Sequence, residues 1–139
     1  MEDIPLHDQH FGYELIRTQL LSNILGDDDE KILYWAGKEL ARSFPQTTLE
    51  EVMTFFHTAN WGELTLEKNK AHKMTLSLTG DPVTARMHYG GDTINYALEA
   101  GFLAQQLETI HEKSTEAHGV MNNHKQLVVF TVMWEDFLD

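Results

Sequence analysis

The chain has 139 residues, the usual size of one domain, and 42% of them are hydrophobic, so it can form one core without disulfide or metal support. Ten Lys and Arg stand against 22 Asp and Glu, giving a formal net charge of -12 that disfavours binding to nucleic acid and to anionic membranes. The absence of cysteine excludes disulfides, thiolate zinc sites, iron–sulfur clusters and a thiol nucleophile.

The first ten residues are polar and contain neither the basic segment nor the apolar segment of a secretory signal. The longest uninterrupted apolar runs, such as 127–130, are too short to cross a bilayer. We therefore expect 1–10 to be a polar lead and 11–139 to form a single cytoplasmic domain that does not insert into a membrane.

Three helices are predicted in the first part of the chain. Over 11–25, apolar residues recur at helical spacing: Leu15, Ile16, Leu20, Ile24 and Leu25. A second helix, over about 28–44, starts with acidic residues that suit the positive end of the helix dipole, and Pro45 ends it. Thr47 and Glu50 form a capping-box pattern that starts a third helix, through about residue 59.

Alternating patterns after Trp61-Gly62 predict strands. The first has Leu64 and Leu66, and the second has Met74, Leu76 and Leu78. A third strand is expected after the turn at 80–82, with alternating Val83, Ala85, Met87 and Tyr89.

A fourth helix, capped by Asp92 or Thr93 and running to about residue 111, carries a stripe of small residues that would let it lie close on a sheet. The chain then forms a hairpin of 115–121 and 126–134, whose second strand is apolar on both faces and is expected in a central, covered position. The order predicts an α+β fold with helices packed on one side of an antiparallel sheet of about four or five strands.

Three stretches carry a resemblance to a known superfamily: YWAGKELA at 34–41, WGEL at 61–64 and YALEAGFLA at 96–104. They resemble the 4-vinyl-reductase-type and TRAPP-subunit-like domains, which are grouped as nitric-oxide-signalling and Golgi-transport ligand-binding domains. Within this group the chain is most similar to the bacterial YslB-like family. The resemblance spans about 12–134 and implies a TRAPP-subunit-like fold that tends to form a cavity and to dimerise through helices.

The chain departs from the chemical features of that superfamily. TRAPP-subunit-like relatives can acylate a buried cysteine, and some 4-vinyl-reductase-type domains carry a cysteine cluster, but this chain has no cysteine. The Tyr-x-Ser-x-Arg clamp of the haem-binding relatives is also missing. The comparison therefore implies neither covalent lipid nor haem, and we expect no cofactor.

Eight histidines raise the question of a metal site. They include His7 and His10 in the lead, and His88, His118 and His124 near predicted strands and turns. No His-Glu-x-x-His motif or comparable spacing is present, so surface and turn positions are favoured and no metal site is predicted.

Two carboxylates, Glu63 and Glu99, are expected near the core, where a raised pKa would suit acid–base chemistry. Pairing with an arginine such as Arg86 or Arg42 is the favoured interpretation. A carboxylate-based enzyme is therefore the third alternative for function.

We expect a non-enzymatic binding module, a homodimeric interaction scaffold whose early helices pack across a two-fold axis. The predicted dimer interface contains Tyr34, Ala36, Gly37 and Leu40. The first alternative is a sensor or carrier of a small apolar ligand held between helices and sheet. Its predicted pocket residues, which would also serve as plain core, are Phe55, Phe56, Trp61, Met74, Met87 and Phe102. An unidentified protein partner is a further possibility.

Overall fold

The computed structural model describes residues 9–91 and 94–135. Most of the predicted polar lead and the predicted helix cap at Asp92 or Thr93 lie outside these residues. No described helix is long and apolar enough to span a membrane. In chain order the elements are α1 (Phe11–Glu14), the π-helix η1 (Leu15–Leu20), α2 (Leu21–Leu25), the 3-10 turn η2 (Gly26–Asp28), α3 (Asp29–Ser43), α4 (Leu49–Thr58), β1 (Glu63–Lys70), β2 (Lys73–Thr79), α5 (Asp81–Tyr89), α6 (Ala97–His111), β3 (Thr115–Asn122) and β4 (Leu127–Trp134).

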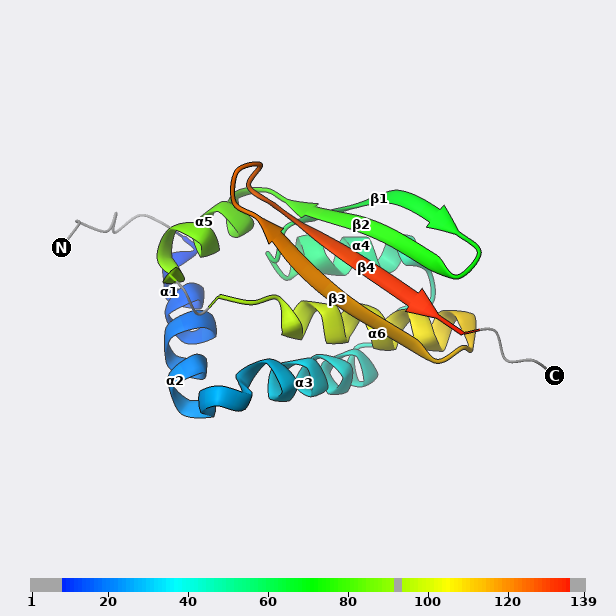
Figure 1. The fold of residues 1–139 in the computed structure, drawn as a ribbon, viewed down its shortest axis with the longest axis horizontal. Coiled ribbons are helices and arrows are strands. Elements are labelled where there is room, and N and C mark those ends of the chain that lie inside the picture. Colours follow the sequence, from blue (N-terminus) through cyan, green and yellow to red (C-terminus); the bar gives the residue numbers. More distant parts are fainter. Residues whose placement is uncertain (1–8, 92–93, 136–139) are drawn as a thin grey trace.

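The sheet has four strands in the order β1-β2-β4-β3, and every neighbouring pair is antiparallel. Helices α4 and α6 lie on one side of it, and α3 packs against α6 in a further layer (Figure 1). The predicted α+β fold, with helices on one side of an antiparallel sheet, is confirmed.

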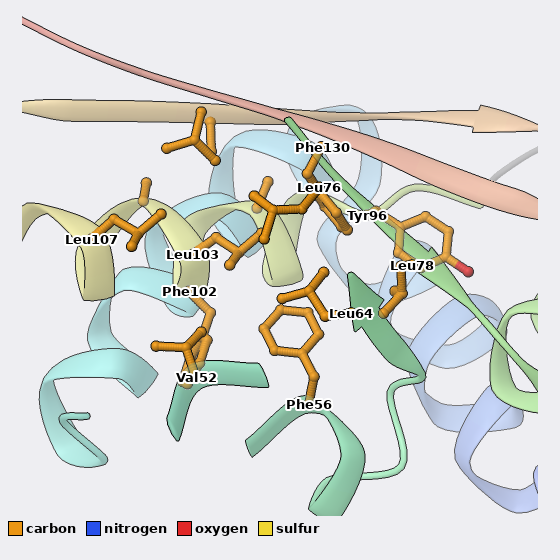
Figure 2. Close-up of a cluster of buried hydrophobic side chains, with 14 of the residues drawn as sticks. Val52, Phe56, Leu64, Leu76, Leu78, Tyr96, Phe102, Leu103, Leu107 and Phe130 are labelled. Atoms are coloured by element: carbon orange, nitrogen blue, oxygen red, sulfur yellow. The ribbon is translucent and has the colours of Figure 1, made fainter. Parts of the chain in front are cut away.

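The core lies between the sheet and α6 (Figure 2). Alternate residues of each strand point to the same face, and those facing the helices are fully or almost fully buried: Met74, Leu76, Leu78, Val128, Phe130 and Val132. The predicted central position of the last strand is confirmed. It is covered on one face only, because Met133 on the other face is exposed.

The predicted third strand is wrong, because residues 81–89 form α5. Pro82 lies in the first turn of this helix, where its missing N–H costs no hydrogen bond and its fixed φ suits a helix. The alternation of apolar residues was therefore misleading: Val83 and Arg86, three residues apart, share the buried side.

The two long helices cross with their backbones in contact. A Cβ atom on Gly37 of α3 would lie 2.0 Å from the carbonyl oxygen of Leu98 in α6, and one on Gly101 of α6 would lie 2.0 Å from the carbonyl oxygen of Tyr34. Only glycine fits at either position, so the small-residue faces of α3 and α6 serve to pack these helices together.

Two helix predictions need adjustment. The N-cap of α4 is Thr48, whose hydroxyl accepts a hydrogen bond from Glu51 N, so the capping box lies one residue later than Thr47 and Glu50. The helix over 11–25 is confirmed, but four of the apolar residues that indicated it lie on its outer side: Leu15, Ile16, Leu20 and Ile24.

Candidate functional site

A groove of about 400 Å³ opens between α3, the start of α6 and the edge strand β3. Its walls are more apolar than polar, and its polar groups come from α3, from the segment just before α6 and from β3. The lining residues are Glu30, Lys31, Tyr34, Ile94, Asn95, Tyr96, Ala97, Ala100, Ala117, His118, Gly119 and Met121.

Tyr34 fixes one end of the groove. Its hydroxyl donates to Glu116 Oε2 at 2.8 Å and accepts from the backbone N–H of Ala117 at 3.2 Å. Burial is the main reason why the pKa of Tyr34 is raised, to about 12, so the hydroxyl stays protonated. Lys38 lies over the ring, with Nζ 4.9 Å from its centroid. Tyr34 therefore provides a hydrogen-bond partner for the outward side of the edge strand β3.

The backbone of β3 offers further polar groups to the groove. The N–H of Ala117 points away from β4, because it donates to Tyr34. In an antiparallel pair this direction repeats every second residue, and the register of β3 with β4 is regular. Gly119 and Met121 therefore direct their N–H and C=O groups outward, at the position where both residues line the groove.

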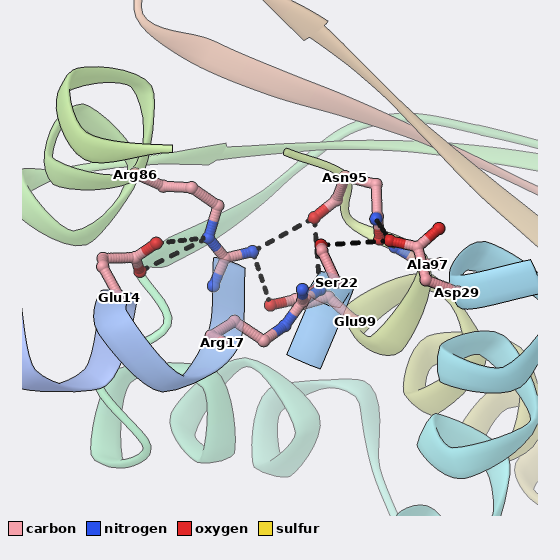
Figure 3. Close-up of polar contacts among 8 residues, drawn as sticks. All are labelled: Glu14, Arg17, Ser22, Asp29, Arg86, Asn95, Ala97 and Glu99. Carbon is pink, nitrogen blue, oxygen red and sulfur yellow. Dashed lines mark hydrogen bonds and ion pairs between the residues drawn. The ribbon is translucent and has the colours of Figure 1, made fainter. Parts of the chain in front are cut away.

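A buried ion network lies behind the groove and joins the first helix to α5 and α6 (Figure 3). Arg86 binds both oxygens of Glu14, at 3.1 and 3.3 Å, and Glu99 Oε2 at 3.0 Å. Arg17 binds Glu99 Oε1 at 3.0 Å. All four side chains are almost fully buried, and their charges sum to zero. We call Glu14, Arg17, Arg86 and Glu99 the ion network.

Asn95 and Tyr96 connect the network to the groove, which both residues line. The carbonyl oxygen of Asn95 accepts from Arg17 at 3.1 Å and from Arg86 at 3.3 Å. The Arg86 guanidinium lies 4.5 Å from the centroid of the Tyr96 ring. Among the described residues, the buried Tyr96 hydroxyl and Arg17 Nε have no hydrogen-bond partner.

The two glutamates of the network differ in pKa. Burial raises the pKa of Glu14, and Arg86 only partly offsets this effect. Burial also acts to raise the pKa of Glu99, but Arg17 and Arg86 outweigh it and hold that pKa below its usual range. Glu99 is therefore a permanent carboxylate at neutral pH.

The structure tests where the two predicted carboxylates lie. Glu99 does pair with Arg86, as favoured from the sequence, and Arg42 instead contacts Glu39. The predicted position of Glu63 near the core is wrong, because its side chain is exposed and contacts His57 Nδ1. Among the described residues, no group of three His, Asp or Glu side chains is placed to hold a metal ion.

The predicted pocket residues lie mostly within a filled aromatic cluster. Phe102 stacks on Phe55, with 4.5 Å between ring centroids, and meets Phe56 and Trp61 edge-on. Met74 is buried in the core and Met87 is half-buried at its edge. None of the six lines the groove beside β3.

The predicted dimer residues are divided by the packing of α3. Gly37 is buried against α6, Tyr34 faces the groove, and Leu40 packs against the core. Gly37 therefore has its close contact within the chain. Sequence reasoning missed Glu14 and Arg17 of the ion network, although a Glu and an Arg three residues apart in an otherwise uncharged helix were a usable signal.

Comparison with known proteins assigns the family. The model of a family described as a protein of unknown function (DUF2507) matches residues 10–133, so the chain belongs to that family. It is 36% identical over 125 residues to the uncharacterized protein YslB of Bacillus subtilis (strain 168), covering 90% of this chain and 84% of the relative.

Solved structures share the fold. A vinyl-4-reductase family protein from Methanocaldococcus jannaschii matches with a TM-score of 0.63 and 23% identity, covering 98% of this chain and 85% of the other. The phenol-responsive sensory domain of the transcription activator PoxR, with phenol, has a TM-score of 0.61 and 13% identity over 96% and 77% of the chains. Subunit 3 of a trafficking protein particle complex from Naegleria fowleri, covalently bound to palmitic acid, has a TM-score of 0.52 and 11% identity over 94% and 95%.

Proposed function

We propose that the chain is a non-enzymatic binding module that holds a small, largely apolar ligand in the groove between α3, α6 and β3. The groove carries this proposal. Its volume of about 400 Å³ is in the range of small-molecule sites, which combine apolar walls with a few polar groups. The apolar part is supplied mainly by Ile94, Ala97, Ala100, Ala117 and Met121.

The chemistry of Glu99 supports binding rather than catalysis. A general acid or base works best with a pKa near the working pH, whereas the arginines hold the pKa of Glu99 below its usual range. Glu99 is also fully buried behind the groove and uses both oxygens for ion pairs. Its role is therefore structural.

The polar groups indicate the kind of ligand. At the edge of β3, Gly119 and Met121 line the groove and direct backbone N–H and C=O groups outward, so a ligand with one hydrogen-bonding atom can pair with them. Proteins of the same fold hold phenol and palmitic acid. A lipid in this chain would be held without a thioester, because there is no cysteine. The ligand class is thus an apolar body with one hydrogen-bonding group.

Native mass spectrometry of gently purified protein, followed by thermal unfolding with phenols and fatty acids, tests the proposal. A ligand that binds the folded state raises Tm. Met121→Trp fills the groove and should abolish the rise in Tm. The control Met133→Trp places the same side chain on the open face of the sheet and should keep it. A wild type that is empty and unaffected by both ligand classes, or equal shifts in the two variants, would refute the proposal.

We also propose that the module works as a homodimer. Support comes from the helices at the start of the chain, where several large apolar side chains are exposed: Tyr13, Leu15, Ile16, Leu20 and Ile24. Contiguous exposed apolar surface commonly marks an interaction site. Measurement of molar mass by light scattering over a range of concentrations tests this point, and a monomer throughout would contradict it.

A further inference from the structure

The helical stretch 11–25 is amphipathic in the reverse of the usual sense. Its only charged residues, Glu14 and Arg17, are each 2% exposed and belong to the ion network. By contrast, Ile16 is 56%, Leu20 49% and Ile24 67% exposed. Charged residues are seldom fully buried, and a surface helix normally turns its apolar stripe to the core.

The π-helix η1 produces this arrangement. In an unbroken α-helix, residues three and seven positions apart share a face, so Arg17 would point the same way as Leu20 and Ile24. The wider i→i+5 turn of Leu15–Leu20 shifts the register between them. Arg17 therefore turns inward to Glu99, and Ile16, Leu20 and Ile24 remain on the outside.

The outer side of this stretch is apolar and carries no charged side chain. We define the outer face by Tyr13, Leu15, Ile16, Leu20 and Ile24. Its neighbours along the helix, such as Gln19 and Asn23, are uncharged. This neutrality contrasts with a chain whose formal net charge is -12.

We propose that the outer face is the surface by which a second copy of this chain binds, helix against helix across a two-fold axis. Two copies carrying -12 each repel one another, so a face without charged side chains is the surface on which they can meet at the lowest electrostatic cost. A basic partner would need acidic side chains on the outer face, and the outer face has none. The assignment rests on the proposed homodimer and adds the surface that forms it.

The size and spacing of the outer face fit this partner. Half-exposed large side chains present on the order of 100 Å² each, so the five in two copies bury on the order of 1,000 Å², the lower size for a specific interface. Ile16, Leu20 and Ile24 follow one another at four-residue spacing, the ridge that packs into the groove of a facing helix. In a two-fold pair such a ridge is centred on Leu20, which lies opposite its own copy.

Substitution at Leu20 tests the assignment, with molar mass measured by light scattering and native mass spectrometry. Leu20→Glu and Leu20→Lys should each weaken the dimer by roughly 100-fold or more, because two like charges face each other. An equal mixture of the two variants should restore a dimer, made of one chain of each kind. The control Val120→Glu changes an equally exposed apolar residue, 59% exposed on the open face of the sheet, and should leave the dimer intact.

The outcomes separate the surface from the dimer itself. A wild type that stays monomeric overturns both proposals. A dimer that survives Leu20→Glu, with unchanged near-UV circular dichroism, overturns the surface alone. Monomeric wild type that binds phosphatidylcholine vesicles, with binding lost in Leu20→Glu, shows that the outer face meets a membrane and also overturns the assignment.

Discussion

The two ends of α6 are buried in opposite ways. At its start, Glu99 is fully buried and pairs with Arg17 and Arg86. From the next turn onward, Phe102, Leu103 and Leu107 are fully buried by apolar side chains of the sheet and α4. One helix thus passes from an ionic environment to an apolar one within a single turn.

Apolar burial and ionic burial contribute to the fold in different ways. Apolar contacts are non-directional, so the C-terminal part of α6 is stabilised by the apolar area that it buries and by the close fit of its side chains. Ion pairs in a dry environment roughly balance their desolvation, but each needs its partner at a defined position. We infer that the ionic end adds little net stability and instead fixes the rotation of the first helix, so that Glu14 and Arg17 face inward.

The largest effect is expected at the apolar end. Phe102→Ala removes a fully buried ring in contact with Phe55, Phe56 and Trp61. The free energy of unfolding should fall by about 4–5 kcal/mol, from lost burial, a cavity and lost aromatic pairs. Urea unfolding measures it. A loss below about 2 kcal/mol would mean that the cluster closes around the gap.

At the ionic end, Glu99→Gln keeps the shape and removes the charge that two arginines share. Leaving buried charges without a partner costs about 3–4 kcal/mol, again measured by urea unfolding. Glu39→Gln, which removes an exposed partner of Arg42, is the matched control and should change stability by less than about 0.5 kcal/mol. Equal effects of the two substitutions would contradict the buried network.

Between the two ends, the backbone contact of α3 with α6 gives a third test. Gly37→Ala places a methyl group against the carbonyl of Leu98, which cannot move aside, and should cost about 2–3 kcal/mol. Gly12→Ala in α1 meets open space and should instead stabilise by up to about 1 kcal/mol, through helix propensity. Thermal unfolding compares them, and a harmless Gly37→Ala would show that the helices can separate.

A smaller effect is expected at the edge of the sheet. Tyr34→Phe keeps the ring but removes the hydroxyl that bridges Glu116 and the N–H of Ala117. The free energy of unfolding should fall by about 1–2 kcal/mol. Hydrogen exchange at Ala117 should become faster, whereas exchange at residues paired within the sheet should not. Unchanged exchange at Ala117 would mean that water replaces the hydroxyl fully.

The apolar contacts of α6 could be predicted from the sequence better than the ion network at its start. Alternation in 74–78 and 127–132 correctly indicated strands, because burial leaves a periodic pattern. Small residues on α6 correctly indicated a close backbone contact, but Gly101 makes it with α3 and not with the sheet as predicted. The same periodicity misplaced 81–89 as a strand, and over 11–25 it indicated a helix without telling that Ile16, Leu20 and Ile24 are exposed. The groove was missed because its walls come from three separate elements. The π-turn and the pairing of Glu14 with Arg86, 72 residues apart, depend on tertiary contacts that no local pattern records.

The dependence of stability on pH distinguishes the two glutamates of the network. The pKa of Glu99 is lower in the folded state than its ordinary value of 4.5. Its contribution is therefore present above that value and is lost as pH falls through the depressed pKa. The pKa of Glu14 is higher in the folded state than 4.5, so its contribution to stability is present below that value and is lost as pH rises through the raised pKa.

On acidification, the free energy of unfolding of wild type should therefore fall relative to that of Glu99→Gln. It should rise relative to that of Glu14→Gln. Urea unfolding of the three proteins from about pH 7 to about pH 2, which extends well below the ordinary pKa of a glutamate, measures both slopes. Slopes of the same sign would show that the two carboxylates share one environment, and the ion network would then not set the orientation of the first helix through two distinct pairs.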